Sequence, residues 1–223
     1  MAVPSASALA RRAQRRERER NQRLESILRA AEAFFADVGY QATNMTQIAD
    51  AAEVSVGTVY FYFKNKEELM VRILADIGYF LRNLLGHQFR EAADPLDGFR
   101  RASHAFFAEF CRDNRQKLII TYRESVSQGE AVEALRRQLL EKLTADVMEA
   151  LSRLAASRRW LGASRYALDT TAAGILGTYE RLAYRYFIWH DAAEDADAIA
   201  AEAFAWIAGG IEAVLGARSG DAP

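Results

Sequence analysis

The chain has 223 residues and a mass of 25.0 kDa, enough for one large domain or two small ones with a buried core. Its net charge of −1 and its 51% hydrophobic content are typical of a soluble globular protein. The net charge alone does not indicate binding to nucleic acid. One cysteine excludes an internal disulfide framework, and no apolar run approaches the ~20 residues of a membrane span, so we expect a cytoplasmic protein without a membrane partner.

The first twenty residues are basic, and we expect them to form a disordered arm. Residues 11–23, RRAQRRERERNQR, contain seven arginines and two glutamates, a net charge of +5. A basic arm beside a DNA-binding domain can contact phosphates or enter a minor groove. Alternatively, the same residues form a solvated helical extension, in which Arg15, Glu19 and Arg23 pair at i,i+4 spacing.

Three helix-start signals then follow in close succession. Residues 24–38 first carry apolar side chains at helical spacing, which predicts a helix that ends at Gly39. The start signals are Asn44 with Gln47, then Ser55, then Asn65 with Glu68. Short helices joined by tight turns are the layout of a helix-turn-helix, whose second helix can enter the major groove of DNA. We assign residues 21–66 to this DNA-binding domain, with Val59 and Phe63 in its core.

Long helices are expected in the remainder, residues 67–218. Proline is missing from residues 96–222, and segments of period 2 that would indicate strands are missing as well. Apolar residues recur at helical spacing in residues 66–85, 94–110, 118–128, 131–160, 164–190 and 199–215. The sequence therefore predicts an all-α protein of about nine helices, with a disordered tail at residues 219–223.

Four groups of residues carry a family resemblance. They are Gly39-Tyr40-x-Ala42-Thr43, Ile48-Ala49-x-x-Ala52, Val54-Ser55-x-Gly57-Thr58-Val59-Tyr60-x-Tyr62-Phe63 and Lys66-Glu67-x-Leu69. This ordered pattern resembles the N-terminal domain of the TetR/AcrR family of transcriptional regulators. Two positions depart from the family. Glu53 replaces a frequent glycine in the turn between the short helices, at a cost of about 1 kcal/mol. Val56 replaces a frequent Lys or Arg, exchanging a phosphate contact for one to a thymine methyl.

The resemblance implies that the second short helix contacts DNA, together with residues at the starts of the helices on either side. The implied DNA-binding residues are Asn44, Thr46, Ser55, Val56, Gly57, Thr58, Tyr60, Phe61, Tyr62, Lys64 and Lys66. Gly57 would let the backbone approach a phosphate, and the hydroxyl groups suit phosphates and base edges. For Phe61 two interpretations stay open: it packs on a thymine methyl or a sugar, or it covers the preceding helix.

The family binds palindromic double-stranded DNA as a twofold homodimer, with recognition helices about 34–36 Å apart. Its dimer interface lies on the last two helices, which here contain Gly174-x-x-Gly177 and Ala208-Gly209-Gly210. Glycine within a helix usually marks the close approach of another backbone. The expected interface residues are Gly174, Gly177, Ile207, Gly210 and Ile211. Packing within the chain is the alternative.

A small lipophilic ligand is expected between the helices of the C-terminal domain, because aromatic side chains are frequent there and commonly line ligand sites. The candidate residues are Phe106, Phe110, Tyr122, Tyr179 and Phe187. The stretch Leu176-Gly177-Thr178-Tyr179-Glu180 is similar to the fatty-acid-responsive branch of the family, which implies an acyl-CoA or a fatty acid. By resemblance, the ligand would move the helix of residues 66–85 and release a repressor from DNA.

Enzyme chemistry is not indicated. His87, His104 and His190 lie far apart without metal-ligand spacing, Cys111 has no neighbouring histidine, and a phosphate-binding loop is missing. We therefore expect no catalytic residue, no metal and no cofactor. A helical lipid- or small-molecule-binding protein without DNA function is the alternative, but it would leave the clustered helix caps without a purpose.

Overall fold

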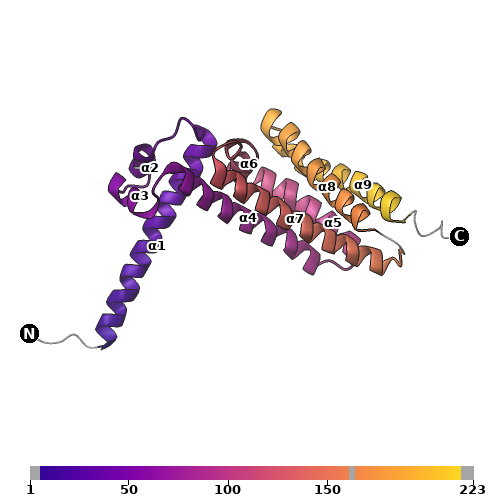
Figure 1. Cartoon of the computed structure of the whole chain (residues 1–223), viewed down its shortest axis with the longest axis horizontal. Helices are drawn as coiled ribbons and strands as arrows, with labels where there is room; N and C mark the ends of the chain where they lie inside the picture. The colour runs from indigo at the N-terminus through magenta and orange to yellow at the C-terminus, as the bar shows by residue number, and fades with distance from the viewer. Residues whose placement is uncertain (1–5, 161–163, 217–223) are drawn as a thin grey trace, which may run out of the picture. The chain divides into compact units, whose positions relative to one another are not determined.

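Helix α1 runs from Ala6 to Asp37 in the computed structural model, which describes residues 6–160 and 164–216 (Figure 1). The described residues form helices and turns without strands, so the all-α prediction is confirmed. The chain divides into two units, Met1–Ile73 (unit 1) and Leu74–Pro223 (unit 2). The division falls inside helix α4, Lys66–Arg90, a few residues beyond the expected boundary at residue 66.

The expected disorder of residues 1–20 is wrong for residues 6–20, which form the beginning of α1; residues 1–5 lie outside the described residues. Helix is favoured here because Ala6–Asp37 contains neither glycine nor proline. In addition, Arg15 Nε lies 2.7 Å from Glu19 Oε1, an i,i+4 pair. The structure thus has the helical extension that was the alternative interpretation.

The predicted caps define the remaining helices of unit 1, α2 (Met45–Ala51), α3 (Val56–Tyr62) and the start of α4. The side-chain oxygen of Asn44 accepts two backbone N–H bonds at 3.0 Å, and the Gln47 side chain accepts from the Asn44 backbone at 2.8 Å. Ser55 Oγ accepts from the first turn of α3 at 3.1 Å. Asn65 Oδ1 accepts from the backbone of Glu68 at 2.8 Å. Local sequence therefore fixes where all three helices begin.

Two turns of unit 1 have left-handed backbone. Gly39, with φ of 98°, follows α1, and its N–H donates to the carbonyl of Phe34 at 3.1 Å. Glu53, with φ of 55°, stands between α2 and α3, where the family usually has glycine. The predicted strain at Glu53 is therefore present. Val59 and Phe63 are buried as expected and anchor α3 in the core.

Unit 2 contains the rest of α4 and five further α-helices, several of which continue directly into π-helical segments. Its elements are α5 (Pro95–His104), η1 (Ala105–Arg112), α6 (Arg115–Ile119), η2 (Ile120–Glu124), α7 (Glu130–Ser157), α8 (Arg165–Leu182), η3 (Ala183–Trp189), η4 (Ala193–Asp195), α9 (Ala196–Ile211) and η5 (Glu212–Gly216). Of the η segments, η4 is a 3₁₀ turn and the others are π-helical. Helix α4 continues to Arg90, past Gly86 and beyond the predicted range of residues 66–85, since one glycine costs only about 1 kcal/mol in a helix.

The core of unit 2 is built on α5 and η1, against which α9 packs, while α8 packs on α7 and α9 (Figure 1). Aromatic rings fill its centre: Phe106 stacks on Tyr179 with ring centroids 4.9 Å apart, and Phe107 on Phe187 at 6.1 Å. Helices α4 and α7 approach closely at Gly78, where an added Cβ would lie only 2.5 Å from Leu139 Cδ2.

The C-terminal stretch Ala193–Gly216 is long and apolar enough to cross a membrane by length and composition, with a mean hydropathy of 1.6 over an 18-residue window. This finding corrects the expectation that no apolar run reaches that length. Core helices of soluble proteins meet the same criterion. Here Ile199, Ile207 and Ile211 face the interior of unit 2 and are at most 9% exposed. The other side of α9 is exposed.

Candidate functional site

Helix α3 presents large apolar side chains to solvent. Val56, Tyr60 and Phe61 are 40%, 52% and 75% exposed. Gly57 lies beside them, and a Cβ added there would meet only Ser55 Oγ at 3.8 Å. Packing within unit 1 therefore does not require glycine at this position. An exposed apolar surface with room for close backbone approach is typical of a contact surface.

Phe61 is the most exposed of these side chains, and its only recorded ring contact among the described residues is with Tyr62, at 5.2 Å between centroids in an edge-on arrangement. At 75% exposure it does not cover the preceding helix, which was one of the two interpretations. Its ring is left available to a partner molecule.

Several polar candidates lie around α3 in unit 1. Asn44, Thr46 and Lys64 are exposed, the first two at the start of α2 and the third after α3. The hydroxyls of Ser55 and Thr58 are 2.8 Å apart and hydrogen-bond to each other, while Ser55 also caps α3. The side-chain oxygens of Ser55 and Asn44 are both committed to helix caps, whereas the Asn44 amide nitrogen, Thr46 and Lys64 remain accessible.

Lys66 does not have the free side chain expected of a phosphate contact. Its Nζ donates to the carbonyl oxygens of Tyr40, Gln41 and Thr43 at 2.5, 3.3 and 2.8 Å, and lies 4.4 Å from the Tyr40 ring centroid. Burial lowers the pKa of Lys66. This ammonium group closes the loop between α1 and α2, a role that no local pattern indicates, because its acceptors are more than twenty residues away along the chain.

Tyr62 also has an internal partner. Its hydroxyl donates to the backbone carbonyl of Arg20 at 3.2 Å and so joins the end of α3 to α1. The hydroxyl proton that a phosphate contact would use is thus engaged within unit 1 in this structure.

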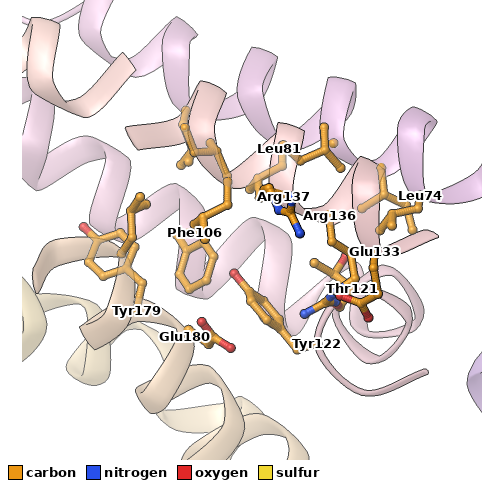
Figure 2. Close-up of a pocket in the computed structure, with 17 residues that line it drawn as sticks. Leu74, Leu81, Phe106, Thr121, Tyr122, Glu133, Arg136, Arg137, Tyr179 and Glu180 are labelled. Carbon is orange, nitrogen blue, oxygen red and sulfur yellow. Dashed lines mark hydrogen bonds and ion pairs between the residues drawn. The ribbon is translucent and has the colours of Figure 1, made fainter. Parts of the chain in front are cut away.

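Unit 2 contains a cavity of about 320 Å³, within the usual size range of small-molecule sites (Figure 2). Leucines and Ile77 from α4, α7 and α8 form most of its wall, and Phe106, Tyr122 and Tyr179 also line it, as predicted. Phe110 and Phe187 do not reach it. They are 0% and 2% exposed in the aromatic core, so for these two the prediction is wrong.

Polar groups gather at one side of this cavity, on η2, α7 and α8. Arg136 is held in place, since its Nη1 donates to the Thr121 carbonyl at 2.7 Å and to Ser125 Oγ at 2.6 Å. Arg137 is exposed and forms no recorded hydrogen bond or ion pair within the described parts of the chain. In Figure 2 it extends towards the space beside Phe106 and Tyr122.

The two tyrosines of this cavity carry neutral hydroxyl groups at ordinary pH. Burial raises the pKa of Tyr122 far above its usual value, and it raises the pKa of Tyr179 to about 12 against the opposing hydrogen bond with Ser103. Tyr184 donates its hydroxyl hydrogen bond to the Tyr122 carbonyl and so fixes η2. The cavity thus offers an apolar wall, the phenolic hydroxyl of Tyr122 and the guanidinium group of Arg137, whereas the Tyr179 hydroxyl is bonded to Ser103 and points away from it (Figure 2).

A second cavity, of about 340 Å³, adjoins the first. Both are lined by Leu85, Leu143, Leu176 and Tyr179, which form a common wall. Near the second cavity Arg82 and Asp146 join α4 to α7 through two hydrogen bonds, Nε to Oδ2 at 2.7 Å and Nη2 to Oδ1 at 2.8 Å. The second cavity is more polar than the first, since charged side chains of α4 and α7, among them Arg90, Glu149 and Arg153, also line it.

The exposed sides of α8 and α9 contain the predicted interface glycines. An added Cβ at Gly174, Gly177 or Gly210 would meet nothing within 4 Å, so these glycines have no packing role within the protomer. Trp206, on the same exposed side of α9, is 63% exposed.

Ile207 and Ile211 belong to the other side of α9. They are 2% and 1% exposed, one helical turn apart on the buried stripe. Their prediction as interface residues is therefore wrong, and they are core residues.

Groups suited to catalysis are not assembled in the described residues. Cys111 is buried, and this burial raises the pKa of its thiol well above the usual value, so the reactive thiolate is disfavoured. Within residues 6–160 and 164–216, no three His, Cys, Asp or Glu side chains come together as a possible metal site.

Comparison with known proteins identifies the N-terminal helices as a known regulatory domain. Residues 27–73, from α1 to α4, match the model of bacterial regulatory proteins of the tetR family. The chain is 32% identical over 133 residues to the HTH-type transcriptional regulator YhgD of Bacillus subtilis. This match covers 56% of this chain and 67% of YhgD. It is 28% identical over 107 residues to the transcriptional repressor KstR2 of Mycolicibacterium smegmatis, covering 48% of this chain and 51% of KstR2.

The fold is similar to the crystal structure of the transcriptional regulator FadR from Bacillus subtilis in complex with stearoyl-CoA. The TM-score is 0.74, and the match covers 84% of this chain and 98% of FadR at 20% sequence identity. This likeness concerns the fold, and its coverage of the chain is larger than that of the two sequence relatives.

Proposed function

The chain belongs to the TetR family of bacterial regulatory proteins, and from this premise we propose that it represses transcription by binding a palindromic operator as a homodimer. A small lipophilic molecule, an acyl-CoA or a fatty acid, releases it from double-stranded DNA. The protein acts in the cytoplasm and carries out no chemical reaction of its own.

The exposed surface of α3 carries the proposal of DNA binding. Val56, Tyr60 and Phe61 leave apolar groups in solvent beside Gly57, and thymine methyl groups and sugars in a major groove suit such a surface. Asn44, Thr46 and Lys64 at its edges suit phosphates. Thr58 lies between these groups and can reach a base edge.

Selection of bound DNA from a random pool tests this proposal. We expect a palindrome whose half-sites are centred about one helical turn, or 34–36 Å, apart. Phe61→Ala should weaken binding and alter the preferred bases, whereas Tyr79→Ala, at a ring of equal exposure on α4, should leave both unchanged. Recovery of no preferred sequence by the wild-type chain, even at low salt, would favour the alternative of a small-molecule-binding protein without DNA function.

The proposed dimer rests on the exposed sides of α8 and α9. Gly174, Gly177 and Gly210 permit close approach of a second backbone, and Trp206 supplies a large ring for burial. Burial of this surface between two copies also accounts for a C-terminal helix that is more apolar than its burial within one protomer requires.

The adjoining cavities of unit 2 support a lipophilic ligand with a polar end. Their shared wall is leucine-rich, which suits an acyl chain, and Arg137 with the neutral hydroxyl of Tyr122 suits a carboxylate, thioester or phosphate group. FadR, which has a similar fold, was crystallised with stearoyl-CoA. KstR2 is a repressor, which favours repression here.

Titration of a protein–operator complex with acyl-CoAs and free fatty acids of increasing chain length tests the ligand. Loss of fluorescence anisotropy of the labelled DNA is expected for the class that binds, and Arg137→Gln should raise the required concentration. Lys142→Gln, at an exposed position on α7 that lines neither cavity, is the matched control. An unchanged anisotropy with every member of both series would exclude this ligand class.

Helix α4 provides the proposed route of release. It begins in unit 1, where Lys66 is bound by backbone carbonyls, and continues into unit 2, where it lines both cavities. A ligand that displaces α4 would therefore bias the position of the recognition helices. Separate crystal structures with DNA and with ligand would show whether α4 moves; an identical α4 in both would exclude this route.

A further inference from the structure

We propose that the N-terminal part of α1, residues 12–23, is a second DNA-binding element, which contacts the phosphates that flank each operator half-site. We call it the basic extension. The proposal depends on the proposed DNA binding by α3, and it adds an element that recognises charge but not base sequence.

The basic extension packs on almost nothing within its own chain. Nearly every side chain from Arg12 to Arg23 is exposed, on all sides of the helix. A helix that is polar all round gains no stability from core packing and depends on i,i+4 pairs such as Arg15–Glu19 or on contacts with a partner. Its recorded attachment to the rest of unit 1 is the hydrogen bond from the Tyr62 hydroxyl to the Arg20 carbonyl. This bond places the base of the extension beside the end of α3.

Charge is divided sharply between the basic extension and the rest of unit 1. Residues 12–23 contain six arginines and two glutamates, a net charge of +4, whereas residues 24–73 contain four basic and seven acidic side chains, a net charge of −3. Moreover, Lys66, one of those four cations, is held by carbonyl groups of its own unit. Since DNA binding in general depends on cations that replace condensed counterions, the helix-turn-helix alone is poorly equipped for it.

The arginines are not spread evenly around the extension. Arg12, Arg16, Arg20 and Arg23 follow one another at spacings of four, four and three residues, which places them along one side of the helix (the arginine stripe). Arg15 lies off this stripe and is paired with Glu19 at 2.7 Å. A row of cations on one side suits a row of phosphates better than an irregular surface.

The extension is long enough to enlarge the DNA footprint. Residues 12–23 of a continuous helix span about 18 Å, because each residue adds about 1.5 Å. That length corresponds to roughly five base pairs at about 3.4 Å each. Phosphates outside the bases read by α3 are therefore within reach of the arginine stripe.

Two double variants of the full-length chain test the proposal with equal loss of charge. Arg12→Gln/Arg16→Gln removes half of the stripe, whereas Arg15→Gln/Arg18→Gln removes two arginines from outside it; glutamine retains good helix propensity in both. Circular dichroism of each variant checks that the helix persists. Affinity for the selected operator is then measured at several salt concentrations.

The stripe variant is expected to lower the slope of log affinity against log salt by about 1.8 per protomer, since each lost phosphate contact changes it by about 0.9. The off-stripe control should change the slope much less. Operator DNA lengthened by ten base pairs on each side should gain affinity for the wild type and less for the stripe variant. An equal slope for wild type and both variants, or an equal decrease in both, would overturn the proposal.

Other outcomes separate this proposal from the one on which it rests. If the wild type recovers no operator at all, the proposed function fails. If it binds its operator with a slope that the stripe variant leaves unchanged, only the role of the extension fails. Binding of the wild type, but not of the stripe variant, to vesicles of anionic phospholipid, with unchanged DNA binding, would assign the extension to a membrane surface and overturn the proposal.

Discussion

Gly78 provides a direct test of the packing between α4 and α7. In Gly78→Ala the new Cβ would lie 2.5, 2.9 and 3.2 Å from Cδ2, Cδ1 and Cγ of Leu139, so that the leucine must move. Overpacking of this kind costs about 1–3 kcal/mol. Replacing glycine by alanine within a helix recovers about 1 kcal/mol. We therefore expect a net loss of stability between zero and about 2 kcal/mol.

Gly86→Ala is the matched control on the same helix. Its Cβ would lie 3.4 Å from Arg90 Nη1, at the end of a flexible side chain, so the full gain of about 1 kcal/mol should appear. Urea unfolding followed by circular dichroism measures both variants, and an unchanged dependence on urea shows that the comparison is valid. The two variants should differ by about 1–3 kcal/mol. Equal stabilities would refute the close approach of α4 and α7.

The same substitution has a second readout. Leu139 lines the first cavity, and the space available to a displaced side chain is that cavity. Gly78→Ala should therefore weaken ligand binding, while Gly86→Ala, which lies beside the second cavity only, provides the comparison. An unchanged ligand affinity in Gly78→Ala would mean that Leu139 moves elsewhere.

Three further outcomes are expected. Trp206→Glu should shift the dimer towards monomer in sedimentation equilibrium, whereas Tyr79→Glu, at another exposed ring, should not; a Trp206→Glu dimer as stable as the wild type would contradict the proposed interface. Lys66→Met should lower the free energy of unfolding of unit 1 by about 1–3 kcal/mol, because the part-buried carbonyls of Tyr40 and Thr43 lose their donor. Lys64→Met, at an exposed lysine, should have almost no effect. Burial raises the pKa of Tyr179 from 10.0 to about 12, so this tyrosine loses its proton at a lower pH in the unfolded chain than in the folded one. The free energy of unfolding should therefore fall between pH 10 and 12, by at most about 1.4 kcal/mol per pH unit. Tyr179→Phe should reduce that slope in unfolding measured across this range, and an equal slope would contradict the burial of the hydroxyl.

The parts of the fold that depend on neighbouring residues were predictable from the sequence. The caps at Asn44, Ser55 and Asn65 act within one helical turn, so their residue types and spacing are sufficient to locate three helix starts. The strained turn at Glu53, by contrast, was expected only from the family resemblance.

Features that depend on distant contacts were not predictable. Lys66 has the residue type of a phosphate ligand, yet its acceptors come from another part of the chain. Phe106 and Phe110 are equally apolar and one turn apart, but only Phe106 reaches the cavity. Ile207 shares its helix with the exposed Trp206, and which side of that helix is buried depends on α5 and η1.

The π-helical segments have a consequence for the history of this chain. Each has i→i+5 hydrogen bonds, so that one residue more or fewer turns the following side chains around the axis, and such segments are frequent at functional sites. Segments η1 and η2 supply Phe106 and Tyr122 to the first cavity. A descendant that lost one residue from either segment would keep its helix and its fold but would direct different side chains at the ligand. Single-residue gaps between related chains in residues 105–112 and 120–124 should therefore coincide with changes of inducer.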